Sequence, residues 1–266
     1  MDTLTLPWTS YIPHQPTAKQ LAFLLLENSE ALYGGAAGGG KSDALLMAAL
    51  QYVDQPDYAA LLLRRSYTDL ALPGALMDRA KAWLMPTDAQ WREATKTWTF
   101  PSGATLTFGY LEHTGDEYRY QSTEFQMIGF DELTQFDENH YRYMFSRLRR
   151  RKDGSAPLRM RSASNPGGIG HEWVRSRFLD TTPDEAGRVF ISARLPDNPY
   201  LDQEAYIQSL EQLDPVTRRQ LLQGDWSARQ PGNLFQREWF PVVEDVPVFI
   251  NRSVRYWDLA ATPKRP

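Results

Sequence analysis

The sequence predicts an α/β fold in which helices cover both faces of a mainly parallel central sheet. Two observations lead to this prediction. Short apolar runs typical of buried strands alternate along the chain with stretches of helical periodicity, a pattern that favours parallel strands joined by helices. One of these strands ends in a glycine-rich loop at residues 35–42, and the loop leads directly into a helix. A strand, a glycine loop and a helix in this order form one unit of such a sheet.

The amino-terminal part of the chain predicts helices and strands in alternation. The apolar run LAFLLLE indicates a short helix that begins after Thr17. Residues 31–35 form an apolar run that ends in glycines, and residues 42–53 place leucine and alanine at helical spacing. Residues 58–63 predict a second strand, and residues 76–84 predict another helix.

The middle of the chain begins with a hairpin and continues with single strands. Residues 97–100 and 105–110 alternate apolar and polar side chains around a Pro-Ser-Gly turn, which is typical of a β-hairpin. Three further strands are expected at residues 125–132, 158–163 and 189–194. After these strands, residues 203–226 predict a small helical lid that is interrupted at Asp214-Pro215, followed by a linker at 230–241 and a last strand at 254–257.

Composition excludes several classes of protein. The 266-residue chain has 42% hydrophobic residues, enough for a sizeable core, and its net charge of −4 argues against a wholly basic nucleic-acid-binding domain. It contains no cysteine, which excludes disulfides and thiolate metal sites, and its four histidines lack metal-ligand spacing. No stretch approaches the ~20 apolar residues of a membrane span, and the polar start does not resemble a signal peptide, so we expect a cytoplasmic protein.

The glycine-rich loop carries the clearest chemical signal. It fits the pattern G-x-x-x-x-G-K-[ST] with the residues Gly35, Ala36, Ala37, Gly38, Gly39, Gly40, Lys41 and Ser42. Glycines allow successive backbone N–H groups to turn inward around phosphate oxygens at a helix N-terminus. Lys41 then reaches the terminal phosphates and Ser42 binds Mg²⁺. The alternative, a glycine turn without a ligand, is disfavoured by the strand before it and the helix after it. The expected ligands are ATP and Mg²⁺.

Two acidic residues follow the apolar strand at residues 125–132. Asp131 is expected at the carboxyl edge of the sheet, where its carboxylate can hold the Mg²⁺ shell, and Glu132 beside it can activate the attacking water. In the alternative interpretation both acids are solvated and cap a helix that starts near Thr134. Together with the loop at Lys41, they indicate a nucleotide hydrolase.

Several segments, taken in order, resemble the large terminase subunit of tailed bacteriophages, which packages DNA into the procapsid. The segments are HQPTAKQLAFL at 14–24, YGGAAGGGKS at 33–42, LLLRRSYTDL at 61–70, YRYQSTEFQMIGFDELTQF at 118–136, SASNPGG at 162–168, LLQGDW at 221–226 and RYWDLAAT at 255–262. The resemblance implies a P-loop NTPase of the RecA-like, additional-strand catalytic-glutamate class. A nuclease domain similar to ribonuclease H follows in that family. An ATPase that drives DNA translocation is the function it implies.

The same resemblance implies roles for other polar residues. Gln20, together with Gln15, matches the glutamine that recognises adenine, although an ordinary helix-surface glutamine is an equal alternative. Ser164 and Asn165 match a motif that senses the γ-phosphate and couples hydrolysis to the lid. On sequence alone, Asn165-Pro166-Gly167 is better explained as a simple turn.

The family also implies an arginine finger that acts from a neighbouring subunit. Arg119 is the candidate, because a guanidinium can neutralise charge that develops on the transferred phosphoryl group. A surface ion pair with Asp116 or Glu117 is an equal alternative. Arg64 and Arg65 are rivals, as phosphate sensors or as structural arginines. The basic run at 147–152 could contact DNA phosphates, but a solvated charged face explains it better.

The implied domain organisation has three parts. Residues 1–195 are expected to form the ATPase core, residues 196–232 the helical lid, and residues 233–266 a linker with the first strand of a truncated nuclease domain. Asp258 in that strand matches the first metal-binding acid of the nuclease. Because the carboxylates that would complete a two-metal site do not follow it here, we expect no nuclease activity from this chain.

The expected partners come from the family alone. They are double-stranded DNA, other copies of the chain in a ring of five, the portal protein and the small terminase subunit, in the cytoplasm of an infected bacterium and transiently on the procapsid. Two other functions fit the loop: a helicase-like or repair-type ATPase, which would need a second motor domain, and a nucleotide-dependent scaffold with little turnover. Glu132 argues against the scaffold.

Overall fold

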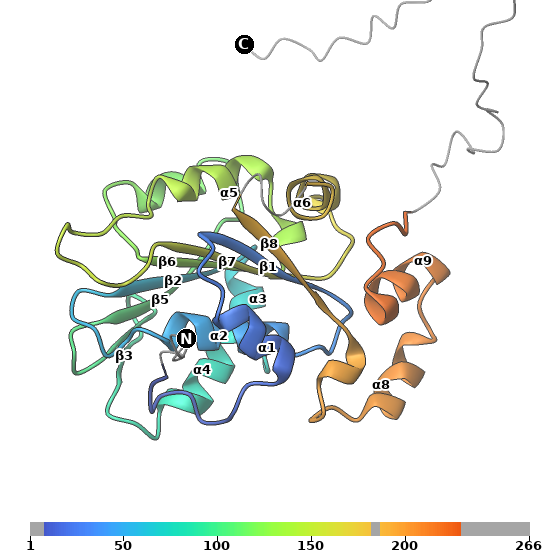
Figure 1. Ribbon diagram of the computed structural model, residues 1–266, viewed down its shortest axis with the longest axis horizontal. Helices are drawn as coiled ribbons and strands as arrows, with labels where there is room; N and C mark the ends of the chain where they lie inside the picture. The colour runs from blue at the N-terminus through green and yellow to red at the C-terminus, as the bar shows by residue number, and fades with distance from the viewer. Residues whose placement is uncertain (1–7, 182–186, 230–266) are drawn as a thin grey trace, which may run out of the picture. The chain divides into compact units, whose positions relative to one another are not determined.

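A computed structural model describes residues 8–181 and 187–229 of the chain (Figure 1). Its strands are β1 Glu30–Gly35, β2 Ala59–Arg64, β3 Gln90–Arg92, β4 Thr97–Thr99, β5 Thr105–Tyr110, β6 Met127–Asp131, β7 Arg159–Ser164 and β8 Arg188–Ala193. Its α-helices are α1 Ala18–Leu24, α2 Lys41–Leu50, α3 Tyr67–Ala71, α4 Leu76–Leu84, α5 Glu138–Phe145, α6 His171–Phe178, α8 Gln203–Leu210 and α9 Pro215–Arg218. Short helical turns are η1 Asp116–Tyr120, η2 Leu133–Gln135, η3 Leu195–Asp197 and η4 Arg219–Gln223.

The described strands form one sheet in the order β3-β4-β5-β2-β6-β7-β1-β8. Strands β5, β2, β6, β7, β1 and β8 are mutually parallel, whereas β3 and β4 attach antiparallel at one edge. The predicted α/β class with a mainly parallel sheet is therefore confirmed. Strand β7 lies between β1 and β6, so that one additional strand separates the loop strand from the acidic strand, as the terminase resemblance implies.

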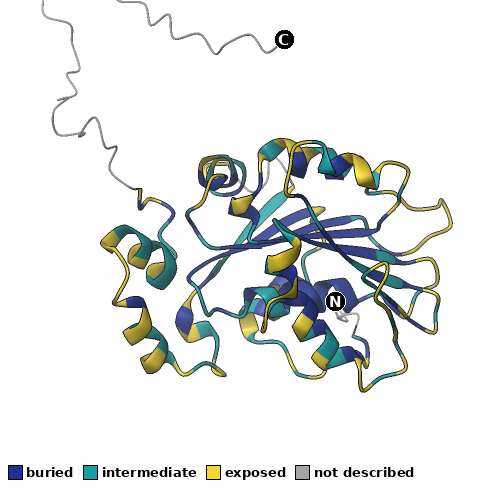
Figure 2. Cartoon of the chain, turned by 180° about the vertical axis from the view of Figure 1, so that it is seen from behind, coloured by how far each residue is buried: buried dark blue, intermediate teal, exposed yellow. Residues whose placement is uncertain are grey.

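Helices cover both faces of the sheet. Helices α1, α2 and α4 pack on one face and α5 and α6 on the other (Figure 1). The central strands are buried on both faces, which is why they read as continuous apolar runs, and Figure 2 shows this buried layer between helices with exposed outer faces. None of the helices in the described parts of the chain has the length and apolar character of a membrane span.

Most elements expected from the sequence are present at nearly the predicted bounds. Helix α1 begins after Thr17, whose side chain forms a capping box with Gln20, and the predicted helix at 76–84 coincides with α4. The predicted hairpin is the β4–β5 pair. In the lid, Asp214 caps α9 and Pro215 opens it, which explains the predicted interruption. The predicted linker and last strand, with Asp258, lie outside the described residues.

Candidate active site

The glycine-rich loop joins β1 to α2 at the carboxyl edge of the sheet. Gly35, Gly38 and Gly40 have φ angles of 134°, 75° and 74°, which L side chains rarely adopt, so the loop depends on glycine at these positions. Lys41 is buried, and its Nζ donates a hydrogen bond to the Ala36 carbonyl oxygen at 2.5 Å, across the loop. Burial lowers the pKa of Lys41, and the Glu132 and Asp131 carboxylates oppose that shift.

Asp131 ends β6 and faces the start of α2. Its Oδ1 accepts a hydrogen bond from Ser42 Oγ at 3.0 Å, and its Oδ2 pairs with Arg64 at 3.2 Å. Two oxygens on one edge of a Mg²⁺ octahedron lie about 2.9 Å apart, because each Mg–O distance is about 2.0–2.1 Å. The Ser42 and Asp131 oxygens therefore fit as Mg²⁺ ligands. Within residues 8–181 and 187–229, no cluster of three His, Asp or Glu side chains could hold a metal by itself.

Glu132 follows Asp131 in a strained backbone conformation. Its φ of 55° lies in the left-handed region, which costs a residue other than glycine about 1–3 kcal/mol and commonly marks a functional site. The carboxylate shares a cavity of about 370 Å³ with Lys41 and Ser42. Burial and the neighbouring Asp131 carboxylate raise the pKa of Glu132, while Lys41 lowers it. This arrangement can supply a general base close to the phosphate loop.

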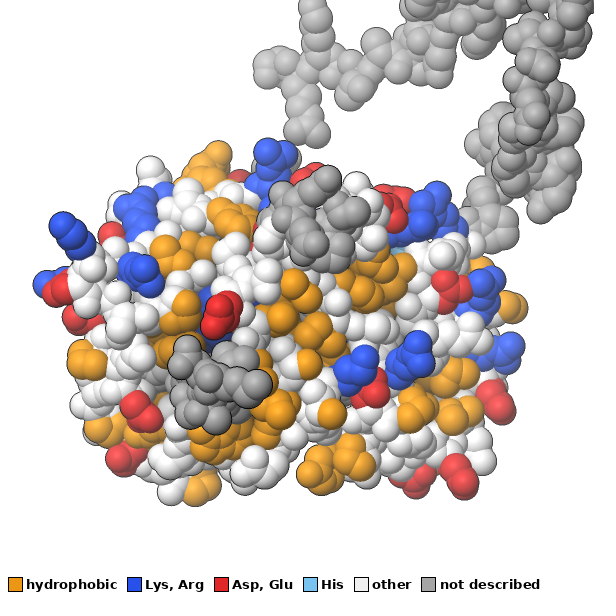
Figure 3. All heavy atoms as spheres, in the orientation of Figure 1, with side chains coloured by type: hydrophobic (Ala, Val, Ile, Leu, Met, Phe, Trp, Pro, Cys, Tyr) orange, Lys and Arg blue, Asp and Glu red, His pale blue; other side chains and the backbone are white. Residues whose placement is uncertain are grey.

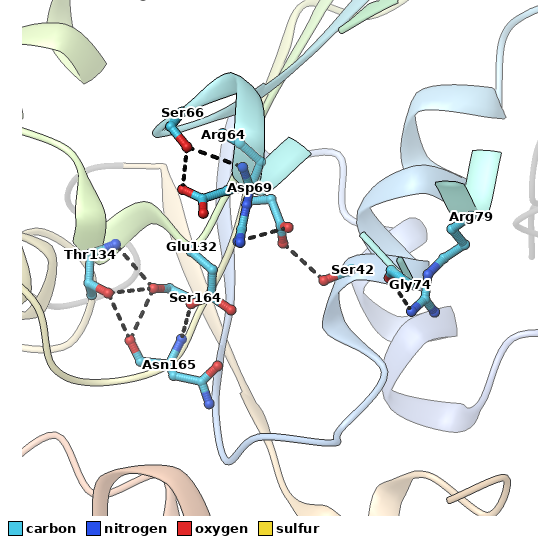
Figure 4. Close-up of polar contacts among 11 residues, drawn as sticks. Ser42, Arg64, Ser66, Asp69, Gly74, Arg79, Glu132, Thr134, Ser164 and Asn165 are labelled. Carbon is cyan, nitrogen blue, oxygen red and sulfur yellow. Dashed lines mark hydrogen bonds and ion pairs between the residues drawn. The ribbon is translucent and has the colours of Figure 1, made fainter. Parts of the chain in front are cut away.

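The end of β7 contacts both the acidic strand and the glycine-rich loop, and Figure 4 shows its contacts with Glu132 and Thr134. Ser164 Oγ accepts a hydrogen bond from the Thr134 backbone N–H at 3.1 Å and lies 3.0 Å from Thr134 Oγ1. Asn165 donates its Nδ2–H to the Gly35 carbonyl oxygen at 3.0 Å, and its backbone N–H lies 3.4 Å from Glu132 Oε2. Asn165 lines the cavity, whereas the fully buried Ser164 acts on it only through Thr134 and Asn165.

The two predicted adenine-reading glutamines occupy different environments. Gln20 is buried; its Oε1 accepts from the Thr17 N–H and its Nε2 donates to the Gly40 carbonyl oxygen, both at 2.9 Å. Gln15 is exposed. The structure thus places Gln20 against the phosphate loop, where it stabilises the turn before α2, and neither glutamine lines the cavity.

The three candidate arginines are separated. Arg64 lies in the site through its pair with Asp131, and Arg65 donates a hydrogen bond to the Leu111 carbonyl oxygen at 2.6 Å. Arg119 lies outside the cavity on η1, where it is exposed, pairs with Asp116 and stands 4.5 Å above the Tyr110 ring. The ion pair with Asp116 is the one that the alternative interpretation of Arg119 expects. Arg119 therefore lies at the surface, where Asp116 and the Tyr110 ring hold its guanidinium.

The basic run at 147–152 lies at the amino ends of the strands, opposite the phosphate loop. Arg149 lies 3.8 Å from Glu124, and Arg151 lies within 4 Å of two aspartates, Asp57 at 3.8 Å and Asp153 at 3.4 Å. A larger cavity of about 470 Å³ lies here, lined in part by Asp57, Glu124, Arg151 and Asp153, and no residue of the glycine-rich loop lines it. Acidic and basic side chains are also interspersed on the face in Figure 3. The exposed residues 149–152 thus agree with a solvated charged face, whereas Arg147 is buried and lies over the Tyr143 ring.

The lid contributes residues that the sequence interpretation missed. Asn198, Leu201 and Tyr206 line the loop cavity from the lid side, and Arg79 lines it from α4. Asn198 Nδ2 donates to the Gly38 carbonyl oxygen at 2.7 Å, and the Leu221 carbonyl oxygen accepts from the Ala37 N–H at 2.7 Å. These contacts join residues more than 150 positions apart, so no local pattern could have identified them. The segment LLQGDW is part of the terminase resemblance, but its contact with the loop through Leu221 was not predicted.

Comparison with known proteins agrees with the fold and identifies the family. The family model described as terminase large subunit, T4likevirus-type, N-terminal, matches residues 32–242. The large terminase of a thermophilic bacteriophage superposes with a TM-score of 0.68 at 14% identity, covering 85% of this chain and 57% of that one. The ATPase domain of the Thermus phage P74-26 large terminase gives a TM-score of 0.56 at 13% identity, covering 84% of this chain and 99% of that domain.

Two other solved structures extend the comparison. The terminase of the same thermophilic bacteriophage in complex with ADP matches with a TM-score of 0.64 at 18% identity, over 80% of this chain and 54% of that one. The HK97 bacteriophage large terminase gives 0.57 at 13% identity, over 80% and 51%. No curated protein sequence matches the chain. At these identities the structures establish the fold, and the chain spans little more than half the length of the thermophilic phage terminase.

Proposed function

The chain belongs to the family of large terminase subunits, and from this membership we propose that it is the ATP-hydrolysing motor domain that drives viral DNA into a procapsid. The observation that carries the proposal is one cavity lined by Lys41, Ser42, Glu132 and Asn165 at the carboxyl edge of the sheet. A phosphate loop alone would support nucleotide binding. The buried carboxylate of Glu132 in the same cavity supports hydrolysis.

The residues of the loop and of the ends of β6 and β7 have distinct roles in this proposal. The loop N–H groups and Lys41 bind the β- and γ-phosphates, and Lys41 offsets the negative charge of the terminal phosphate. Ser42 and Asp131 would hold Mg²⁺, which supplies positive charge to the phosphate oxygens when it is bound. Glu132 accepts a proton from the attacking water. Asn165, anchored on Gly35, stands where it can report the state of the γ-phosphate to β7 and Thr134.

The proposal is tested by measuring phosphate release from ATP. The purified chain is expected to hydrolyse ATP with Mg²⁺, and chelation of the metal with EDTA should lower the rate at least about tenfold, because the Ser42–Asp131 pair has an oxygen spacing that suits this ion. ATP binding measured by calorimetry in the same buffer is the companion experiment. A chain that binds neither ATP nor ADP would contradict the proposed function.

The domain boundaries predicted from sequence are retained as a proposal. Residues 1–195 include all the described strands, and the lid proposed at 196–232 begins after β8, which ends at Ala193. Residues 233–266, the proposed linker and first nuclease strand, lie outside the described part. Double-stranded DNA, a ring of copies, the portal protein and the small terminase subunit are the proposed partners, and the cytoplasm of the infected host is the proposed place of action.

Arg119 is proposed as the finger that enters the cavity of a neighbouring copy. Its exposed position on η1, outside its own cavity, supports an action between subunits. Two variants that are each inactive, one without the finger and one without the base, should therefore restore ATP hydrolysis when they are mixed. Equal amounts of Arg119→Ala and Glu132→Ala subunits, mixed at concentrations that allow assembly, are expected to hydrolyse ATP at least about fivefold faster than either variant alone. A mixture of Arg65→Ala with Glu132→Ala is the control. If this mixture gains as much phosphate release as the mixture with Arg119→Ala, the result would count against Arg119.

A further inference from the structure

The lid helix α8 brings a tyrosine into the loop cavity. Tyr206 lies on the same cavity as Lys41 and Glu132, although more than 70 residues separate it from either. Its ring packs on the loop at Gly38: a Cβ placed on that glycine would lie 3.3 Å from Tyr206 Cε1 and 2.6 Å from Leu201 Cδ2. A loop residue with a side chain would therefore collide with the lid. The Tyr206 ring therefore lies against the loop at Gly38.

The hydroxyl of Tyr206 is free to bind a ligand. Within the described residues this hydroxyl has no hydrogen-bond partner. Burial and the Glu132 carboxylate raise the pKa of Tyr206, so the phenol stays protonated at neutral pH and acts as a donor. The donor lines the same cavity as Lys41 and Glu132, and the lysine of such a loop binds the terminal phosphates of ATP.

We propose that Tyr206 is a catalytic residue of the lid, whose hydroxyl donates a hydrogen bond to a γ-phosphate oxygen of bound ATP. This inference rests on the proposed function and adds a contact that distinguishes ATP from ADP. The contact also gives the lid a direct means of detecting the γ-phosphate. Loss of the γ-phosphate after hydrolysis removes the acceptor, and the lid then keeps the packing of Tyr206 and Leu201 on Gly38 together with the Asn198 hydrogen bond ahead of α8.

The test removes the hydroxyl and keeps the ring. In the full 266-residue chain, Tyr206→Phe is expected to weaken binding of the slowly hydrolysed analogue ATPγS about tenfold with Mg²⁺, the effect of losing one hydrogen bond to a charged group. ADP affinity should change less than about twofold, because ADP lacks the acceptor. Calorimetry measures both constants. The rate of ATP hydrolysis should also fall about tenfold.

Tyr200→Phe is the matched control, because it makes the same chemical change at an exposed lid position outside the cavity. It should leave the ratio of ATPγS to ADP affinity unchanged. An unchanged ratio in Tyr206→Phe, including the case in which only hydrolysis slows, would overturn the γ-phosphate contact while leaving the proposed function intact. Wild-type chain that binds neither nucleotide would overturn both.

Discussion

Changing Glu132 to glutamine is expected to lower kcat for ATP hydrolysis about 1,000-fold, within the range that general bases contribute. The amide has the shape of the carboxylate but cannot accept the proton of the attacking water. Binding of ATP should change less than about threefold, because Lys41 and the loop N–H groups carry the phosphate contacts. Single-turnover phosphate release and calorimetric ATP binding separate the two effects.

Glu124→Gln is the control for this substitution. It makes the same change just before β6, at the opposite edge of the sheet, where Glu124 lies 3.8 Å from Arg149. Its kcat should match that of the wild type. Normal turnover in Glu132→Gln would show that another group activates the water and would remove the observation on which the proposed hydrolysis depends.

The environment of Glu132 also predicts the acid side of the pH profile. Burial, and then Asp131, raise the pKa of this carboxyl above its usual range. The base works only when ionised, so activity is full above the raised pKa and is lost as the pH falls through it. The acid limb of kcat should therefore lie at a higher pH than that of an ordinary glutamate, whose pKa is about 4.3.

Strands and the phosphate loop were predictable because their signals are local. Buried parallel strands appear as apolar runs, and the loop pattern needs only eight consecutive residues. Strand β7 was predicted too, but the burial of its Arg159 and Arg161 side chains was not predictable. Arg161 donates to the Leu26 and Asn28 carbonyl oxygens near the end of α1, and Arg159 donates to Ala48 in α2. Their acceptors are carbonyl groups from distant segments, which no sequence window contains.

The residues of the candidate site also divide into those with a local sequence signal and those placed by contacts between distant segments. Lys41, Ser42, Asp131 and Glu132 were predicted from motifs, and the structure brings them together. Tyr206 was missed because its relation to the loop exists only after the lid folds back over Gly38. The short elements α3 and β3 were also missed, since five or three residues carry too little periodicity to be recognised.

A glycine of the lid segment supports the phosphate loop from outside and gives the second large expected effect. Gly224 has a φ of 66°, and a Cβ placed on it would lie 2.5 Å from the Ala36 backbone N and 2.8 Å from the Gly35 carbonyl carbon. Both neighbours are backbone atoms and cannot rotate away. Any side chain at 224 must therefore push the lid segment off the loop and stretch the hydrogen bond from Ala37 to Leu221.

Gly224→Ala is expected to lower the free energy of unfolding by about 3 kcal/mol, from roughly 1–2 kcal/mol of left-handed strain and a similar cost of overpacking. ADP affinity should fall at least about tenfold, because the loop that binds the phosphates loses its support. Urea denaturation and calorimetry measure the two quantities.

Gly103→Ala isolates the packing cost in this prediction. Gly103 has a φ of 91° in the turn between β4 and β5, and a Cβ there meets no atom within 4 Å, so its replacement carries the backbone strain alone. The difference in unfolding free energy between the two variants is therefore the cost of the clash between the added methyl group and the loop backbone. If Gly224→Ala is no less stable than Gly103→Ala and keeps its ADP affinity, the lid segment does not support the loop. The lid would then follow the nucleotide through the contacts that Asn198, Leu201 and Tyr206 make with the loop at Gly38.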